Sequence, residues 1–169
     1  MITTEYVSTM AKYNYWQNTS HYTAASKLNE EMRREDLGAF FGSIHATLSH
    51  LLWGDQIWMN RFAGTPKPEA GSIGQSVYEV AEWDDLRQKR FAFDQEIISW
   101  SEKVTQDFLD GELSWFSGAL KKDITKPTAF LVLHMFNHQT HHRGQVHAML
   151  TRQGCRLDDT DVFAMPERF

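Results

Sequence analysis

The feature that most constrains the fold of this chain is one long helical segment near its C-terminal end, from Pro127 to Gln153. A proline suits the first turn of a helix, where its fixed φ is favourable and its missing N–H is not needed. Gly154 follows the segment and suits the left-handed conformation that ends many helices. The charge of Arg152 is favourable at the negative end of the helix dipole. The sequence therefore predicts a helix over this whole range.

Three further segments carry apolar residues at three- and four-residue spacing, which is typical of amphipathic helices. These segments span Thr4–Glu31, Ile44–Phe62 and Asp84–Leu109. Ser43 is suited to cap the second of them. Residues 111–126 have no helical period, and they could pair as a short hairpin around Gly118. Four long helices predict an all-α fold, a four-helix bundle with a short irregular or hairpin segment before the last long helix, in one domain over residues 1–169.

Composition excludes several classes of protein. The chain has 17 Lys and Arg against 22 Asp and Glu, a formal net charge of -5, which is unfavourable for a surface that binds nucleic acid. The longest apolar run is Ala129–Leu133, far short of the ~20 residues of a membrane-spanning helix, and the N-terminal residues do not resemble a signal peptide. The single Cys155 rules out an internal disulfide and a cysteine-based zinc site. We expect a cytoplasmic protein with neither a nucleic-acid nor a membrane partner.

Histidine is the unusual residue of this chain, because five of its 8 histidines lie on the last predicted helix. At about 100° per residue, His138 and His142 fall on the stripe that should face the bundle interior. They are four residues apart, so their rings lie one above the other on neighbouring turns and can hold one metal ion. A buried histidine can instead be a hydrogen-bonded core residue, although two adjacent protonated rings would repel one another. The spacing alone leaves both interpretations open.

A third metal ligand would have to come from another helix. His45 and His50 on the second predicted helix are the candidates, and periodicity does not separate them, while His21 is a weaker option. Asp55 lies among the apolar residues of the same helix, where it could be a ligand or an acceptor for a ligating histidine. An ion pair between Asp55 and an arginine such as Arg143 is an alternative interpretation of equal weight.

Three motifs of this chain resemble the DinB/YfiT-like family of metal-dependent proteins. The strongest is HMFNHQTHHRGQ at residues 134–145, which is similar to the signature of that family's fourth helix. The second is HATLSH at residues 45–50, followed by Asp55 and Trp58, and YNYWQN at residues 13–18 resembles the family's first helix. The motifs follow the order expected for the family and cover most of the chain.

The resemblance implies a four-helix bundle, often dimeric, in which three histidines bind one divalent metal ion. Carried over by motif, the ligands are His50, His138 and His142, and His50 is preferred over His45 because it lies eight residues before Trp58. Three neutral imidazoles leave a coordination position open, as in catalytic rather than structural zinc sites. Zinc, nickel, iron or manganese would each suit the site, and affinity order alone does not choose among them.

Relatives of this kind include S-transferases and isomerases that use low-molecular-weight thiols such as mycothiol or bacillithiol. By resemblance we expect a thiol-dependent transferase or a hydrolase that acts on a small molecule, forms a homodimer, and uses Asp55, His134 or His141 as an acid or base. The alternative is a binding or stress-response protein in which the metal only stabilises the bundle. A carboxylate di-iron bundle is excluded because the sequence has no Glu-x-x-His pairs. A DNA-acting enzyme is disfavoured by the net charge.

Overall fold

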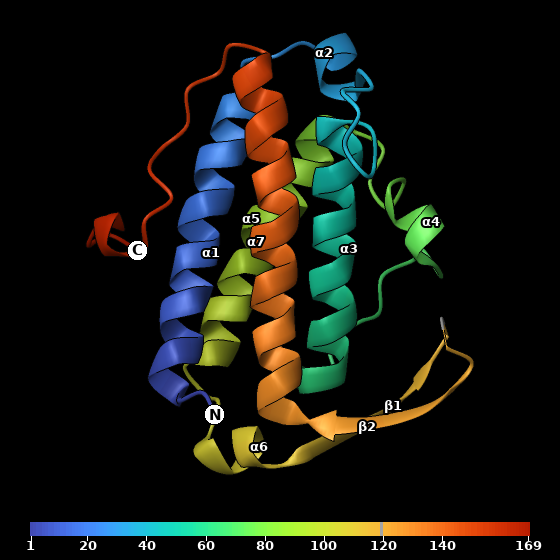
Figure 1. Cartoon of the computed structure of the whole chain (residues 1–169), viewed down its shortest axis with the longest axis vertical. Helices are drawn as coiled ribbons and strands as arrows, with labels where there is room; N and C mark the ends of the chain where they lie inside the picture. The colour runs from blue at the N-terminus through green and yellow to red at the C-terminus, as the bar shows by residue number, and fades with distance from the viewer. Residues whose placement is uncertain (119) are drawn as a thin grey trace.

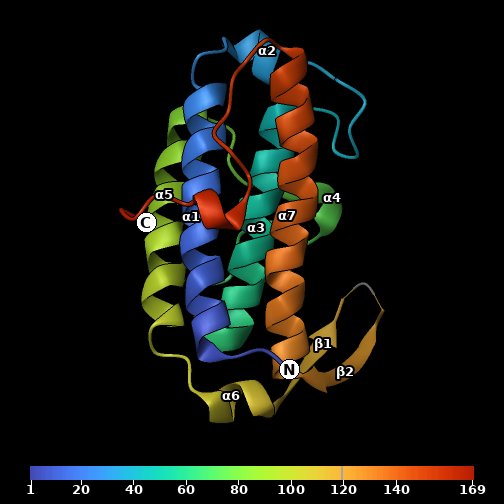
Figure 2. The same cartoon turned by 60° about the vertical axis from the view of Figure 1, so that its left-hand side comes forward.

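The computed structural model describes residues 1–118 and 120–169, in which four long helices form a bundle (Figures 1 and 2). Going round the bundle, α1 packs against α5, α5 against α3, α3 against α7, and α7 against α1. The bounds of these helices are Thr4–Ala25 for α1, Ile44–Ala63 for α3, Trp83–Ser101 for α5 and Thr128–Arg152 for α7. A two-stranded hairpin directly precedes α7. The predicted bundle with a hairpin before its last long helix is confirmed.

The first predicted helix was too long, because a cap in the sequence divides it. Thr3 caps α1 by accepting a hydrogen bond from the Tyr6 N–H, and the helix ends at Ala25. The Asn29 side chain then accepts from the Met32 N–H and begins a separate short helix, α2 (Glu30–Arg34). An asparagine so placed satisfies a backbone donor that would otherwise lack a partner, so a new helix starts there.

The third predicted segment divides in the same way. Helix α5 ends at Ser101, and Thr105 caps a new helix, α6 (Gln106–Asp110), by accepting from the Phe108 N–H. The predicted continuous helix to Leu109 is therefore wrong. Leu109 is nevertheless buried at 1% exposure, because α6 turns to close the lower end of the bundle (Figure 1).

The ends of α3 follow the sequence closely. Ser43 accepts a hydrogen bond from the Ala46 N–H, which confirms the predicted cap, and Gly64 ends the helix in the left-handed region at φ 69. The connection from α3 to α5 contains one short helix, α4 (Ile73–Ser76). This connection lies against α3, because the Ser49 hydroxyl donates to the Ser76 carbonyl at 3.0 Å.

The hairpin consists of β1 (Glu112–Ser117) and β2 (Lys122–Pro127), paired antiparallel with Trp115 opposite Ile124. Pro127 is the last residue of β2, and α7 begins directly after it. After α7, Gly154 adopts a left-handed φ of 78, as predicted, and the tail carries a short 3-10 helix, η1 (Val162–Ala164). The hairpin thus positions the first turn of α7.

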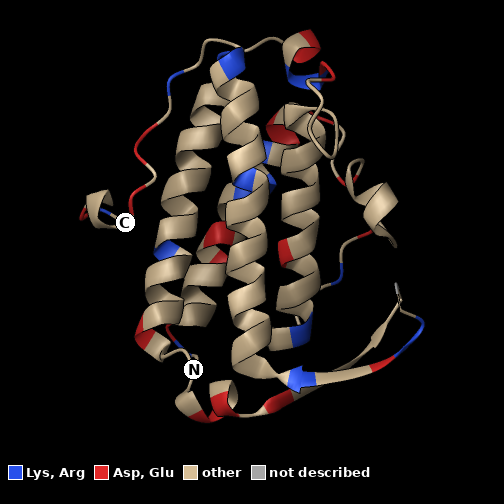
Figure 3. Ribbon diagram, viewed as in Figure 1, with Lys and Arg blue, Asp and Glu red and all other residues tan. Residues whose placement is uncertain are grey.

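The bundle interior is mainly apolar, but it contains a ring of buried polar contacts that joins all four long helices; we call it the polar ring. Charged segments are accordingly visible half-way along the bundle as well as at its ends (Figure 3). The contacts are Asp55 with Arg90 (α3–α5), Asp94 with Asn18 (α5–α1), Asn14 with Arg143 (α1–α7) and Gln139 with the Leu51 carbonyl (α7–α3).

At the centre of the polar ring, two carboxylates share one guanidinium. Arg90 lies 2.8 Å from Asp55 and 2.8 Å from Asp94, and all three side chains are 1% exposed. Burial raises the pKa of both carboxyl groups, that of Asp94 to about 6, and the Arg90 charge opposes the shift. Asp55 therefore forms the predicted ion pair with an arginine, but its partner is Arg90 and not Arg143.

Among the described residues, no helix is long and apolar enough to cross a membrane.

We expect Arg90→Met to lower the free energy of unfolding by about 3–5 kcal/mol, because it leaves two buried carboxylates without their cation. The matched control is Arg87→Met on the same helix, whose pair with Asp84 is exposed and which should change stability by less than about 0.5 kcal/mol. Urea unfolding followed by tryptophan fluorescence measures both. Equal losses in the two variants would contradict this role of Arg90.

Candidate metal centre

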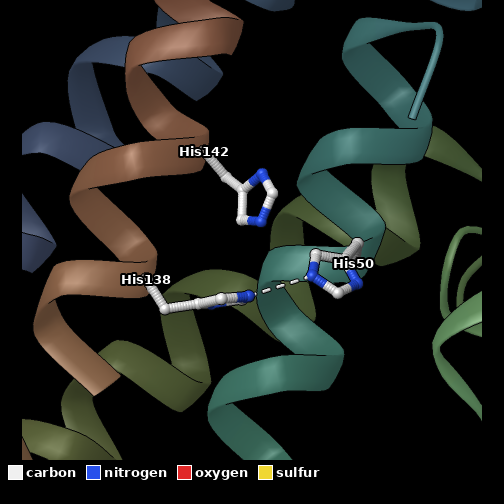
Figure 4. A group of neighbouring side chains, drawn as sticks. All are labelled: His50, His138 and His142. Atoms are coloured by element: carbon white, nitrogen blue, oxygen red, sulfur yellow. Dashed lines mark hydrogen bonds between the residues drawn. The ribbon is translucent and has the colours of Figure 1, made fainter. Parts of the chain in front are cut away.

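Three histidines from two helices converge between α3 and α7. His50 lies on α3, and His138 and His142 lie on adjacent turns of α7 with ring centroids 4.6 Å apart (Figure 4). One ligand nitrogen from each of the three lies within 4.8 Å of the others, and the Nε2 atoms of His50 and His138 are 3.0 Å apart. The chain thus has a buried three-histidine cluster that could hold a metal ion.

The hydrogen bonds around the cluster select one tautomer of His50. The Ser76 hydroxyl donates its only proton to the Ile73 carbonyl at 2.5 Å, so it must accept from the His50 Nδ1–H, which is 2.7 Å away. Nδ1 therefore carries the proton of this imidazole, and its Nε2 has a free lone pair. That lone pair faces His138.

His142 is oriented in the same way by a side chain on its own helix. The Gln145 Oε1 can only accept, and it lies 3.0 Å from His142 Nδ1, so Nδ1 carries the proton and Nε2 is free to bind a ligand. Partners of this type fix the orientation and tautomer of metal-binding histidines.

Burial keeps the three rings neutral. Burial, together with the charge of the neighbouring His142, lowers the pKa of His50 to about 4 and that of His138 to about 3. Burial also lowers the pKa of His142. At neutral pH the cluster therefore presents neutral imidazoles, which is the form that binds metal ions.

The donor set fits a divalent transition metal. Imidazole nitrogen suits zinc, nickel and iron. A hydrogen bond between His50 and His138 leaves the nitrogen of His142 without a partner, whereas one metal ion can bind a nitrogen of all three histidines. A tetrahedral ion with metal–nitrogen bonds of about 2.1 Å places its ligand nitrogens about 3.4 Å apart. The observed separations of 3.0 Å and up to 4.8 Å bracket that value.

Close packing holds the cluster in place. A Cβ atom on Gly54 would lie 3.0 Å from Cε1 of His138, so a larger residue at this position of α3 would push the His138 ring away by a few tenths of an ångström. The ring of Phe41 covers the other side, with its centroid 4.0 Å from that of His50 and 5.3 Å from that of His142. The three rings have little freedom to turn away from one another.

A cavity of 690 Å³ adjoins the cluster, and both His50 and His138 lie in its wall. Its floor is mainly apolar, from Trp53, Ile57 and Trp58 of α3. This volume lies within the range of small-molecule sites. A second cavity, of 450 Å³, lies between α1 and α7 and contains His21 but none of the clustered histidines.

Two of the predicted acid–base residues lie near the cluster, in different positions. His134 is exposed, lies in the wall of the 690 Å³ cavity, and packs its ring 5.2 Å from that of Trp58. His141 is also exposed, and its Nε2 accepts from the Gln145 amide at 3.3 Å. Gln145 therefore connects His141 to His142.

The other candidates of the sequence analysis have different partners. Asp55 is held by Arg90 in the polar ring. His45 is buried and hydrogen-bonds through Nε2 to the Val80 carbonyl at 2.9 Å. His21 is buried and hydrogen-bonds through Nδ1 to the Gln17 carbonyl at 2.7 Å. Both histidines thus have their hydrogen-bond partner outside the cluster.

Three residues that orient or pack against the clustered histidines were not predicted from the sequence. Gly54 could have been noticed in the sequence, because glycine in a helix interior lowers helix stability by about 1 kcal/mol relative to alanine and its presence there indicates close packing. Gln145 shares the α7 stripe with His142 and could have been found from that spacing. Ser76 lies 26 residues from His50 at the end of the short helix α4, and no spacing rule connects the two residues.

Comparison with known proteins gives a consistent result. The sequence matches the model of the DinB family over residues 1–167. It is similar to Protein DinB of Bacillus subtilis (strain 168), at 25% identity over 154 residues, covering 89% of this chain and 87% of that protein. A crystal structure of a DinB-like protein from Bacillus cereus ATCC 10987 is similar in fold, with a TM-score of 0.55 and 16% identity over 85% of this chain and 90% of that one.

We expect Ser76→Ala to let His50 exchange between its two neutral tautomers, because the Nδ1–H loses its hydrogen-bond acceptor. Long-range ¹H–¹⁵N NMR of the imidazoles in metal-free protein at pH 7.5 should show His50 almost wholly as the Nδ1–H form in the wild type and as a mixture in the variant. Ser72→Ala, at the exposed position directly before α4, is the control and should leave the spectrum unchanged. A wild-type His50 in the Nε2–H form would contradict the assignment.

Proposed function

This chain belongs to the DinB family, and from that premise we propose that it is a metal-dependent enzyme whose metal is held by His50, His138 and His142. The observation that carries the proposal is the cluster of three neutral imidazoles, two with a free Nε2, beside a cavity large enough for a small molecule. The ion is one divalent transition metal per chain: zinc, nickel, iron or manganese.

The cavity favours an enzyme over a bundle that is merely stabilised by metal. A structural zinc site is closed by four protein ligands, whereas three ligands leave a position for substrate or water. Within residues 1–118 and 120–169, the histidine cluster is the only group of three or more metal-binding side chains close enough to share an ion. An ion held there would lower the pKa of a water or thiol that it binds.

We propose a thiol-dependent S-transferase or a hydrolase, acting on a small-molecule substrate. The 690 Å³ cavity brings that substrate to the cluster, and its apolar wall excludes water from the reacting groups. His134 lines this wall and serves as the proton acceptor, because partial desolvation of its ring and the nearby Arg61 lower its pKa and keep its imidazole neutral at pH 7. His141 acts through Gln145 on the orientation of His142.

We expect wild-type protein, purified without an affinity tag, to contain about one divalent metal ion per chain. His138→Ala and His142→Ala should each lose most of it, because two remaining imidazoles bind a metal far more weakly than three. His147→Ala, on the same helix but lining the 450 Å³ cavity, is the matched control and should keep its metal. Elemental analysis by mass spectrometry measures all four proteins, and full metal content in either ligand variant would refute the assignment.

For the thiol reaction, we expect N-acetylcysteine, mycothiol or bacillithiol to raise the Tm of zinc-loaded protein but not of chelator-treated protein. At a thiol concentration about tenfold above Kd, the rise should be about 3 °C or more. S-methyl-N-acetylcysteine, which cannot form a thiolate, is the control and should have no metal-dependent effect. If every thiol fails, the transferase is rejected and the hydrolase remains.

A further inference from the structure

An unpaired cation lies in the wall of the cavity beside the histidine cluster. Arg61 of α3 lies three residues after Trp58 and lines the same cavity as His50 and His138. Its guanidinium carbon lies over two indole rings, 4.5 Å from the ring centroid of Trp58 and 5.2 Å from that of Trp115. Trp115 belongs to β1, so the hairpin before α7 helps to orient this side chain.

In the described residues, none of the ion pairs includes Arg61, although the side chain is partly buried. Burial lowers the pKa of Arg61, but an arginine remains charged at any physiological pH. A partly desolvated cation without a counter-ion is unfavourable. The buried arginine of the polar ring, by contrast, is neutralised by two carboxylates. Arg61 therefore has an unused capacity to bind an anion.

The shape and chemistry of the guanidinium favour one class of anion. Its planar set of donors matches a carboxylate through two parallel hydrogen bonds. The indoles of Trp58 and Trp115 meet edge to face at 70°, and contact with both rings limits the movement of the guanidinium. A single cation balances a single negative charge, which fits a monocarboxylate better than a doubly charged phosphate.

The rest of the cavity defines the other parts of the ligand. Ile57 and the rings of Trp53 and Trp58 provide an apolar surface between Arg61 and the histidines. A ligand that fills this space would have a carboxylate at one end and an apolar, preferably flat, body. Its other end would face His50 and His138.

We propose that the cavity binds small organic carboxylates, with the carboxylate paired to Arg61 and the apolar body on Trp58 and Ile57. As the substrate class of the enzyme, this inference rests on the proposed function, because the far end of the ligand then lies at the histidine cluster. The pairing with Arg61 does not itself need a metal, so the two proposals can fail separately.

The test is a titration of zinc-loaded and of chelator-treated protein with 3-phenylpropanoate and with its uncharged amide, 3-phenylpropanamide. Binding is followed by ¹H–¹⁵N NMR of the indole N–H groups. The carboxylate should bind at least about tenfold more tightly than the amide in both preparations. The shifts should be largest for Trp53, Trp58 and Trp115, and small for Trp16, which is buried in α1.

In Arg61→Gln the preference for the carboxylate should fall to about one, because the charge is lost while much of the side-chain volume remains. Arg152→Gln, at the exposed end of α7, is the charge-matched control and should keep the preference. Zinc content should stay at the wild-type value in both variants, which separates this result from a failure of the metal site. Equal binding of acid and amide by the wild type, a preserved preference in Arg61→Gln, or no response of the three indoles would overturn the proposal.

Discussion

The polar ring sets the axial register of the four helices, and the histidine cluster depends on that register. Apolar stripes alone tolerate sliding by one turn, about 5.4 Å. Such a shift would separate Arg90 on α5 from Asp55 on α3 and leave this buried carboxylate without its cation, at a cost of several kcal/mol. The contact between Gln139 and the Leu51 carbonyl has the most direct effect, because these residues directly follow His138 and His50 in the sequence. The register that satisfies Gln139 is therefore the register that brings the two imidazoles together.

The parts of the fold that could be predicted are those that leave a local pattern in the sequence. The long helices are predictable because each has a periodic pattern and breakers or caps at its ends, as with Ser43 and Gly64 of α3. The two incorrect bounds share one physical cause. Asn29 and Thr105 each start a new helix within an apolar pattern that continues. The spacing of apolar residues does not reveal such caps, because the capping side-chain oxygen accepts a hydrogen bond from the backbone and leaves that spacing unchanged.

The candidate site is predictable to the extent that its members share a helix. His138 and His142 follow from a four-residue spacing, whereas the choice of His50 over His45 required the family resemblance. The physical reason is that α3 is buried on several sides, so that both histidines are almost inaccessible, at 3% and 1% exposure, and no single face points to the site. Only tertiary partners separate them: His50 meets Ser76 and the α7 histidines, and His45 meets the Val80 carbonyl.

Local and global charge lead to different conclusions about ligands. The net charge of -5 opposes binding of long polyanions, because such ligands sample the field of the whole surface. A small ligand inside the cavity samples mainly the nearest groups, since exposed charges beyond about 10 Å are screened at ordinary ionic strength. Of the described residues that line the cavity, His50, His134 and His138 are neutral and Arg61 is charged, so the wall is positive before any metal binds and more so with a divalent ion present. On that balance the cavity would select small anions, and an ionised thiol at the cluster together with a carboxylate at Arg61 would neutralise most of its charge.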